Sequence, residues 1–428
     1  MSIIEPKILK GTRDFGPEEM AKRLYVMNKV RRVFERYGYD TIETPVIEYA
    51  ETILGKYGEE GDKLTYNFED NGGRHIALRY DQTVPFARYY AANYGVLPTP
   101  FKRYQISRVW RADKPQRGRY REFYQCDIDI IGTDSILAEI EILKVFADVY
   151  KELGLDTSKI TMRINDRGLM DSIMDGVNVP VELRLKVIAA IDKLDKIGED
   201  KVIDILTDLG LQDSQIDEIE KMLDRSGDNA SKLDRFKGYA TAKMAKILEL
   251  GYEAGLTEDI LKFDISLARG LDYYTGMIIE VVYGDESLGS ITGGGRYDNL
   301  CGSFCKERFS GIGAALGFDR IMVIMEEEGL FEDVGLSSQV LVTQFSEEVT
   351  EESLRAYDAL HTAGINAEIY FDCAKMAKQF KYADRKSIPW VLVIGPDEAA
   401  KGVVVLKDMI NGEQEELTIE QVVERLKS

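Results

Sequence analysis

The sequence is poor in histidine and cysteine, and the few that occur are not grouped as catalytic or metal sites require. The only histidines are His75 and His361, which leaves little scope for Ser-His triads, multi-histidine zinc sites or proton transfer between imidazoles. Cys301 and Cys305 have C-x3-C spacing, but no second pair lies nearby to complete a zinc site. The four cysteines form no disulfide framework, so we expect a reducing compartment.

The chain also lacks apolar segments of the length that membranes require. No apolar run approaches the ~20 residues of a membrane span, and the N-terminal MSIIEPKILKGTRDF has no apolar core long enough for a signal peptide. We therefore expect a cytoplasmic protein without a membrane partner. No G-x-x-x-x-G-K-[ST] pattern occurs, which argues against a Walker-type ATPase.

Negative charge, in contrast, is abundant. The formal net charge is −20, which opposes indiscriminate binding of nucleic acid but leaves room for docking on local basic patches. The length of 428 residues suggests two or three domains, each large enough to bury its own core.

Residues 101–132 reverse the charge locally. Eight of the first 21 residues of this segment are lysine or arginine, and Asp113 alone opposes them. The pattern predicts a strand over 105–110, a loop of turn formers, and a return strand over 123–131 whose two aspartates alternate with apolar residues. Such a hairpin can bind a polyanion on its guanidinium groups, although a solvated basic hairpin has the same pattern.

The segment before this hairpin is expected to contain a helix, an edge strand and a capped helix. An amphipathic helix over 18–37 leads to a strand over 40–48, where Pro45 favours an edge or interface position. This pair fits a dimer interface and, equally well, a plain surface element. Residues 81–83 (Asp-Gln-Thr) precede a further helix, where their side chains either cap its N-terminus or point into an adjoining pocket.

The chain changes character at about residue 154. After a strand-like KITMRIND, the segment up to about 262 is charged, helical and poor in aromatic residues until Phe236. We find no catalytic constellation in it. We therefore interpret it as an inserted helical module with a structural or partner-binding role.

Residues 263–283 return to strand character and include a lone arginine. A cation fixed between apolar strands is unfavourable without an anionic partner, so Arg269 should pair with Asp264, Asp272 or a bound substrate. The three glycines at 293–295 allow close backbone approach, either to a ligand or to a neighbouring strand.

Residues 311–317 have the spacing G-x-G-x-x-x-G. This misses the dinucleotide fingerprint G-x-G-x-x-G at its third glycine, which weakens a Rossmann interpretation. The alternative is a small-residue strand that runs into a helix over 318–325 and presents Arg320 in the first turn.

The last part of the chain alternates strands and helices. An acidic, glycine-containing linker at 331–338 precedes this part, and the pattern over 339–428 predicts an α/β domain with a mostly parallel sheet. Basic residues cluster at 375–386, where a solvated helix face is the plain interpretation. The KMAK at 375–378 faintly echoes the lysine loop of class I synthetases, but the His-Ile-Gly-His pattern of that class is absent.

Several stretches of the chain resemble the histidyl-tRNA synthetases, a family of class II aminoacyl-tRNA synthetases. Motif 2 of the family is similar to RVWRADKPQRGRYREFYQCDIDIIG, and motif 3 is similar to GIGAALGFDRI. Motif 1, which forms the dimer interface, resembles the helix–strand pair that ends at Pro45. Two stretches peculiar to the histidine enzymes resemble LRYDQTVPFARY and LARGLDYYTG. The resemblance extends over nearly the whole chain.

The resemblance implies an α+β fold with a class II antiparallel sheet and flanking helices. The catalytic domain would span 1–330 and carry the helical module as an insertion at about 166–255. The linker 331–338 would lead to an anticodon-binding α/β domain over 339–428 with a mostly parallel sheet.

It also implies ATP-dependent ligation of L-histidine to tRNA(His) through a histidyl-adenylate, by a homodimer that needs ATP and Mg²⁺. Adenylation brings a carboxylate to the α-phosphorus of ATP, so positioned cations and Mg²⁺ supply most of the catalysis. Arg111 would bind the α-phosphate and Arg320 the γ-phosphate. Arg269 would stand on the far side of the α-phosphate and form the catalytic pair with Arg111. The Mg²⁺ ligands stay unidentified.

The remaining contacts follow from the same resemblance. The expected histidine pocket comprises Asp81, Gln82, Thr83, Arg111, Gln125, Asp129, Arg269, Tyr273, Tyr274 and Tyr297. The expected ATP contacts are Arg111, Asp113, Arg320 and Phe123, the last by stacking on adenine. The expected tRNA contacts are Lys114 and Arg117 at the acceptor stem and Lys378 and Lys381 in the C-terminal domain. Asp81 and Asp129 stand where some members carry Glu, and Gln82 stands where we expect a small or apolar residue.

Two other classes of function stay open on the sequence alone. A synthetase-like regulatory subunit of histidine biosynthesis generally lacks the anticodon domain and the catalytic arginines, and this chain has both. A dinucleotide-dependent enzyme would use the glycines of 311–317 and would bind NAD or NADP.

Overall fold

The fold is described from a computed structural model that covers residues 3–268, 273–331, 334–335 and 337–427. The chain divides into two compact units, one of Met1–Asp14 with Val26–Leu330 and the other of Phe15–Tyr25 with Phe331–Ser428. Arg269, which the sequence predicts to be catalytic, lies outside the described residues. No helix in the described part of the chain is long and apolar enough to cross a membrane.

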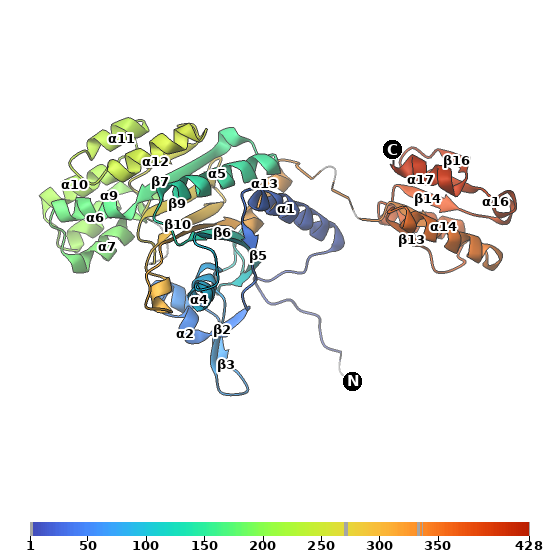
Figure 1. The fold of residues 1–428 in the computed structure, drawn as a ribbon, viewed down its shortest axis with the longest axis horizontal. Coiled ribbons are helices and arrows are strands. Elements are labelled where there is room, and N and C mark those ends of the chain that lie inside the picture. The colour runs from blue at the N-terminus through green and yellow to red at the C-terminus, as the bar shows by residue number, and fades with distance from the viewer. Residues whose placement is uncertain (1–2, 269–272, 332–333, 336, 428) are drawn as a thin grey trace. The chain divides into compact units, whose positions relative to one another are not determined.

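The first unit is built on a mainly antiparallel sheet, to which the described residues contribute eight strands in the order β1-β5-β6-β11-β10-β9-β7-β8. The strands are β1 Asp40–Thr41, β5 Phe101–Trp110, β6 Glu122–Ile131, β7 Ile160–Asp166, β8 Leu261–Phe263, β9 Met277–Tyr283, β10 Thr292–Tyr297 and β11 Gly311–Gly317. The two outermost pairings are parallel, and those between them are antiparallel. Because β11 pairs with β6, the glycine-rich strands lie beside the basic hairpin (Figure 1).

Long helices pack against this sheet. They are α1 Pro17–Arg36, α5 Ile136–Leu153 and α13 Phe318–Glu327. Helix α5 begins after Ser135, whose hydroxyl accepts a hydrogen bond from the Leu137 N–H at 3.2 Å, and it ends at Gly154 with φ +83°. Phe34 of α1 and Phe146 of α5 are buried, with their ring centroids 6.2 Å apart. These contacts fix α1 and α5 to one core.

A smaller sheet and three helices accompany the main sheet. They are β2 Ile47–Tyr49, β3 Asn67–Glu69, β4 His75–Leu78, α2 Ala50–Ile53, α3 Gly58–Leu64 and α4 Thr83–Asn93. The sequence predicts one strand over 40–48, but the structure has β1 and β2 in different sheets. The chain bends between them because Pro45 has no N–H for a ladder and because Arg79 donates to the Glu43 carboxylate at 2.9 Å and the Thr44 carbonyl at 2.7 Å.

The helical module lies between β7 and β8. It comprises α6 Arg167–Gly176, α7 Val181–Ile191, α8 Leu194–Ile197, α9 Glu199–Asp208, α10 Asp213–Leu223, α11 Asn229–Arg235 and α12 Ala242–Glu253. Its helices, green to yellow in Figure 1, gather at the β7 and β8 end of the sheet, and α12 packs against α5. Short 3-10 turns occur at Thr157–Lys159, Cys301–Ser303 and Glu347–Val349.

The C-terminal unit has a mixed sheet in the order β13-β12-β14-β15-β16. Its elements are β12 Val340–Val342, α14 Thr350–Thr362, β13 Ala367–Ile369, α15 Met376–Arg385, β14 Trp390–Val393, α16 Pro396–Lys401, β15 Val404–Asp408, β16 Gln414–Leu417 and α17 Ile419–Lys427. The sequence predicts a mostly parallel sheet, but β14–β15 and β15–β16 are antiparallel. The connection 394–403 is shorter than the dozen or so residues that a parallel crossover needs, and β15–β16 is a hairpin.

Alternate residues of β12 and β14 face two separate cores in this unit. Val340 and Leu392 pack with α14 and α17 on one face. Leu341 and Val391 pack with α15 on the other. Helix α15, which carries the basic cluster, therefore covers the face opposite to α14 and α17.

Candidate active site

A cavity of about 410 Å³ opens on one face of the main sheet. The side chains of a strand alternate between the two faces of its sheet, and in β6 this brings Phe123, Gln125 and Asp127 into the cavity lining. Cys126 and Ile128, which alternate with them, are buried and absent from the lining. The alternation predicted from the sequence thus orients the polar residues of β6 toward one site.

Glycines of β10 and β11 contribute to the cavity lining, among them Gly293 and Gly313. A Cβ on Gly313 would lie 2.0 Å from an Asp129 oxygen, and one on Gly295 would lie 2.8 Å from the Tyr274 ring. Both glycines are therefore required by neighbouring protein atoms. A Cβ on Gly293 would meet no atom closer than Ser290 Oγ at 4.0 Å, and Gly293 lines the cavity. The glycine run of β10 thus serves strand packing at one position and leaves space for a ligand at another.

Two of the three predicted phosphate-binding arginines line this one cavity. Arg111 donates from Nε to the Tyr80 carbonyl at 3.0 Å, and its guanidinium lies 4.3 Å from the centroid of the Tyr80 ring. Arg320, in the first turn of α13, donates to the carbonyls of Ser290 and Gly118. These bonds fix the directions of both cations in advance of ligand binding.

Asp81 organises one end of the cavity. One of its oxygens accepts the Tyr57 hydroxyl at 2.8 Å and the Val84 N–H at 3.0 Å, and the other accepts the Tyr273 hydroxyl at 3.0 Å. The carboxylate therefore both caps α4 and aligns two tyrosines. Burial, with the Asp81 charge, raises the pKa of Tyr57 and of Tyr273 well above its usual value, so both phenols stay protonated as donors.

Asp129 lies behind the cavity lining. Its carboxylate accepts the Tyr297 hydroxyl at 2.5 Å and pairs with Arg103 Nη2 at 2.5 Å, and Asp129 and Arg103 are both buried. Burial raises the pKa of Asp129, while the Arg103 charge and the Tyr297 hydrogen bond act in the opposite direction. Tyr297 itself lines the cavity, so Asp129 influences the site by fixing the position of this tyrosine.

Asp127 is a lining residue that the sequence analysis did not assign to the site. It is 2% exposed, and its Oδ1 has no hydrogen-bond partner among the described residues. Burial raises the pKa of Asp127 well above its usual range, Arg103 lowers it, and Asp129 and Asp81 raise it. Its place between Gln125 and Asp129, two predicted pocket residues on the same strand face, was the signal that could have identified it.

Gln82, predicted to bind histidine, lies outside the cavity lining. Its contacts explain why a glutamine stands where a small or apolar residue is expected. Its side-chain amide donates to the main-chain carbonyls of Ser107 and Gln125 at 3.0 and 3.1 Å. The main-chain carbonyl of Gln82 accepts a hydrogen bond from Arg103 Nη2 at 3.2 Å. Gln82 therefore joins the start of α4 to both strands of the basic hairpin. Its neighbour Thr83 lines the cavity.

Asp113, predicted to contact ATP, is also outside the cavity lining. Its carboxylate accepts a hydrogen bond from Arg119 Nη2 at 2.7 Å, and its carbonyl accepts one from Arg121 Nε at 3.1 Å. Arg119 and Tyr120 line the cavity in its place. The sequence places Asp113 beside the cationic strand end, but the turn that follows directs its carboxylate into the loop.

The predicted tRNA contacts are solvent-exposed and separate from the cavity. Lys114 and Arg117 are exposed in the hairpin loop, and Arg117 pairs with Glu327 of α13. Lys378 and Lys381 are exposed on α15 in the C-terminal unit.

The described residues contain no group of three histidine, cysteine, aspartate or glutamate side chains that could hold a metal ion. A Mg²⁺ ion that arrives with ATP needs only one or two carboxylates, because phosphate oxygens and water fill its other positions. Glu280 lines the cavity with a carboxylate of the required type. The residues present thus fit an ATP-bound Mg²⁺ and not a permanent metal centre.

An arginine-lined cavity on a mainly antiparallel sheet, with a separate C-terminal α/β unit, defines a class II aminoacyl-tRNA synthetase. Residues 11–321 match the model of the histidyl-tRNA synthetase family, and residues 339–428 match that of the anticodon binding domain. The chain belongs to the histidyl-tRNA synthetase family, which confirms the resemblance found in the sequence.

Individual relatives agree with this assignment along nearly the whole chain. The chain is 43% identical to a histidine–tRNA ligase of Porphyromonas gingivalis, over 96% of this chain and 97% of that one. It is 41% identical to one of Bacteroides fragilis, over 98% of both. The crystal structure of histidyl-tRNA synthetase from Nostoc sp. PCC 7120 has a TM-score of 0.85 at 30% identity and covers 99% of each chain.

Proposed function

We propose that the cavity joins L-histidine and ATP as histidyl-adenylate and that the histidyl group then passes to tRNA(His). The observation that carries this proposal is the convergence of Arg111 and Arg320, from distant parts of the chain, on one cavity that also holds a carboxylate–tyrosine cluster. Cations suit a triphosphate, and carboxylates suit an ammonium group and a ring N–H.

In the adenylation step the histidine carboxylate attacks the α-phosphorus. A bond forms between carboxylate oxygen and phosphorus, the bond to the β-phosphate bridging oxygen breaks, and pyrophosphate leaves. Arg111, beside the histidine end, would hold the two anions together, and Arg320 would bind the terminal phosphate. Arg269 is assigned by resemblance alone as the second catalytic arginine. Mg²⁺ would supply further charge on the phosphates, with Glu280 as its protein ligand.

The two ends of the cavity would bind the two substrates. Phe123 offers a ring face for adenine and lies with its centroid 5.4 Å from the Arg111 guanidinium. At the other end Asp81 and Asp129 already accept hydrogen bonds from tyrosines, and Asp129 also pairs with Arg103, whereas the buried Oδ1 of Asp127 has no hydrogen-bond partner among the described residues. Asp127 is therefore the carboxylate best able to accept an N–H of histidine.

The tRNA would contact basic residues outside the cavity. Lys114 and Arg117 lie on the exposed hairpin loop, and Lys378 and Lys381 lie on α15 in the unit that matches anticodon binding domains. Phe371, 92% exposed at the end of β13, could add a ring face for a nucleotide base. We place this reaction in the cytoplasm, where the free Cys126, Cys301, Cys305 and Cys373 would stay reduced.

The protein would act as a homodimer. The small sheet exposes apolar side chains, with Ile47 48%, Tyr49 55% and Phe68 48% exposed. Ile47 falls in the strand expected to form part of the dimer interface, Tyr49 and Phe68 belong to the same small sheet, and a second copy of the chain would remove them from water. Light scattering should give twice the chain mass for the wild type, and Tyr49→Asp should shift it toward the monomer.

The function is tested by exchange of labelled pyrophosphate into ATP with each of the twenty amino acids. Histidine alone should support exchange, and purified tRNA(His) should then become acylated. Exchange that does not depend on an amino acid, or that depends on another one, would contradict the proposal. Binding to a phosphoribosyltransferase without any exchange would instead favour a regulatory subunit.

A further inference from the structure

We infer that Lys243 of the helical module is a positioning residue for the histidine pocket. It acts by fixing the backbone of the segment Tyr273–Gly276, whose tyrosines line the cavity. The inference rests on the proposed function, because it concerns how histidine is bound. It also gives the inserted module a defined contribution to the site.

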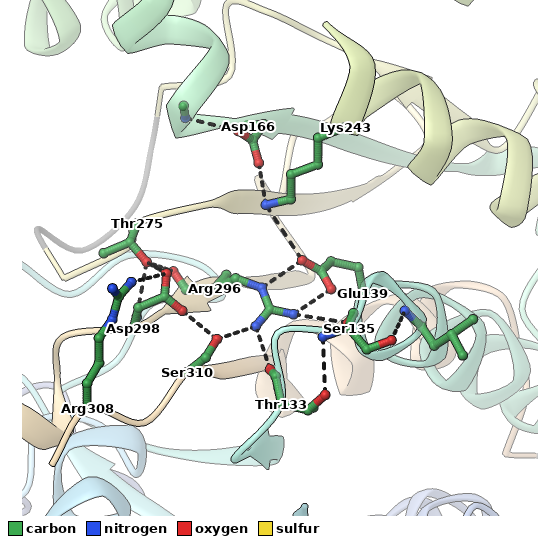
Figure 2. Close-up of polar contacts among 12 residues, drawn as sticks. Thr133, Ser135, Glu139, Asp166, Lys243, Thr275, Arg296, Asp298, Arg308 and Ser310 are labelled. Carbon is green, nitrogen blue, oxygen red and sulfur yellow. Dashed lines mark hydrogen bonds and ion pairs between the residues drawn. The ribbon is translucent and has the colours of Figure 1, made fainter. Parts of the chain in front are cut away.

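Lys243, whose side chain is 37% exposed, joins α12 to an ion network whose two carboxylates are buried (Figure 2). Its Nζ lies 2.8 Å from Asp166 Oδ2 at the start of α6 and 3.8 Å from Glu139 Oε1 of α5. Glu139 is 0% exposed and accepts two hydrogen bonds from Arg296, at 2.7 and 2.5 Å. Lys243 and Arg296 thus balance the two carboxylates, and loss of either cation leaves a negative charge uncompensated inside the protein.

The pocket segment ends against this lysine. A Cβ on Gly276 would lie 3.1 Å from Lys243 Nζ and 3.2 Å from Arg296 Cβ, so the backbone is enclosed by both side chains. The Gly276 carbonyl also accepts the Arg167 N–H of α6 at 3.0 Å. Two elements of the helical module, α6 and α12, therefore contact the segment on its outer side.

The inner side of the segment connects to the cavity. The Thr275 N–H donates to the Arg296 carbonyl at 2.7 Å, and the Thr275 hydroxyl donates to Asp298 at 2.8 Å. Asp298 is held in turn by the Ser310 hydroxyl at 2.5 Å. Just before Thr275 stand the two lining tyrosines, of which Tyr273 donates to Asp81.

Disruption of this ion network should weaken the binding of histidine and leave the binding of ATP unchanged. Tyr273 and Tyr274 would line the histidine end, whereas Phe123 and Arg320, assigned to the ATP end, belong to β6 and α13; the ion pairs of Lys243 are with Asp166 and Glu139, on other elements. A shift of the tyrosines would alter the Asp81 contact and leave the ATP contacts in place. Small displacements of this kind reduce catalysis strongly because the geometry of the bound substrate decides the rate.

The test is steady-state pyrophosphate exchange by the full-length protein with varied histidine and varied ATP. Lys243→Met should raise the KM for histidine by about tenfold and leave the KM for ATP within about twofold. Lys243→Arg keeps the charge and should restore most of the affinity. Lys246→Met is the matched control, because Lys246 lies one turn further along α12 and, among the described residues, pairs only with the exposed Glu249, at 2.9 Å. It should behave as the wild type.

Thr275→Val provides a second arm that changes no charge. It removes the hydrogen bond to Asp298 and should raise the KM for histidine in the same selective way, even if Lys243→Met does not fold. Equal KM values for histidine in Lys243→Met and Lys246→Met would overturn the inference. So would a lower melting temperature with both KM values unchanged, or a wild-type KM for histidine in Thr275→Val. Absence of histidine-dependent exchange in the wild type would instead refute the proposed function.

Discussion

Asp127 lies two residues before Asp129 on β6, and only Asp129 receives a hydrogen bond from the described part of the chain. Asp129 is engaged by the Tyr297 hydroxyl and the Arg103 guanidinium, whereas Asp127 lines the cavity and its buried Oδ1 has no hydrogen-bond partner in the described part of the chain. One carboxylate thus maintains the pocket, and the other retains its capacity to accept a hydrogen bond from a ligand.

This difference predicts opposite effects of two isosteric substitutions. Asp127→Asn keeps the shape of a side chain whose Oδ1 has no hydrogen-bond partner among the described residues, so it should leave the melting temperature unchanged or higher while weakening histidine binding by about tenfold. Asp129→Asn removes the partner of the buried Arg103 and should lower the free energy of unfolding by about 3–5 kcal/mol. Thermal unfolding, with and without histidine, measures both effects. Equal destabilisation by the two substitutions would contradict the distinction.

The raised pKa of Asp127 predicts how its contribution to stability depends on pH. Burial is the main cause, opposed by Arg103 and reinforced by Asp129 and Asp81. Unfolded aspartate has a pKa of about 3.9, so above that pH the folded protein holds a proton that the unfolded chain has lost. The free energy of unfolding of the wild type should therefore fall as the pH rises toward the folded pKa.

The asparagine of Asp127→Asn has no proton to lose, so the melting temperature of this variant relative to the wild type should increase as the pH rises from about 4 toward the folded pKa of Asp127. Asp408→Asn serves as the control. Backbone hydrogen bonds from Asn411 and Ile410 lower the pKa of Asp408, and its effect should be constant over this range. A constant difference for Asp127→Asn as well would show that its pKa is not raised.

The two arginines of the cavity should act on different phosphates of ATP. Arg111→Ala should lower the rate of exchange by ~10²–10³, because a fixed cation beside the reacting phosphorus is lost. Arg320→Ala should mainly raise the KM for ATP, since Arg320 is assigned to the terminal phosphate. Measurement of kcat and KM for ATP separates the two effects. Arg355→Ala, on α14 with an exposed side chain, is a control that should alter neither.

The local pattern of the sequence was sufficient to predict β5, β6 and the helix that begins at Phe318. In these segments alternation or helical spacing, turn residues and charge all favour one structure. The family resemblance assigned four further residues to one site, and all four line the same cavity: Arg111, Phe123, Gln125 and Arg320.

The contacts of Gln82 and Asp113 could not be predicted in the same way. Gln82 is explained only by the carbonyls of Ser107 and Gln125, which long-range strand pairing brings beside the start of α4. The orientation of Asp113 depends on a loop in which Arg119 folds back onto it. Lys243 is one of the two lysines of α12, and nothing in the sequence distinguishes it from Lys246; the fold places it against Gly276.

The basic face of α15 should act on tRNA without any effect on adenylation. Lys378 and Lys381 are exposed on a helix of the C-terminal unit, whereas we propose that adenylation takes place in the cavity of the first unit, without tRNA. The double substitution of both lysines by glutamate should raise the KM for tRNA(His) by about tenfold or more. It should also reduce the salt dependence of tRNA binding, with a slope smaller by about 2, because each lysine displaces about one counterion.

Lys401→Glu is the matched control for this charge reversal. It lies on α16 of the same unit and pairs with Glu416 at 3.7 Å, so it changes the charge of the unit without touching α15. An equal loss of tRNA affinity in Lys401→Glu would mean that only the total charge of the unit matters. A normal KM for tRNA in the double variant would remove α15 from the tRNA interface. Unchanged histidine-dependent exchange in both variants is required in either case, because it reports that the first unit has kept its fold.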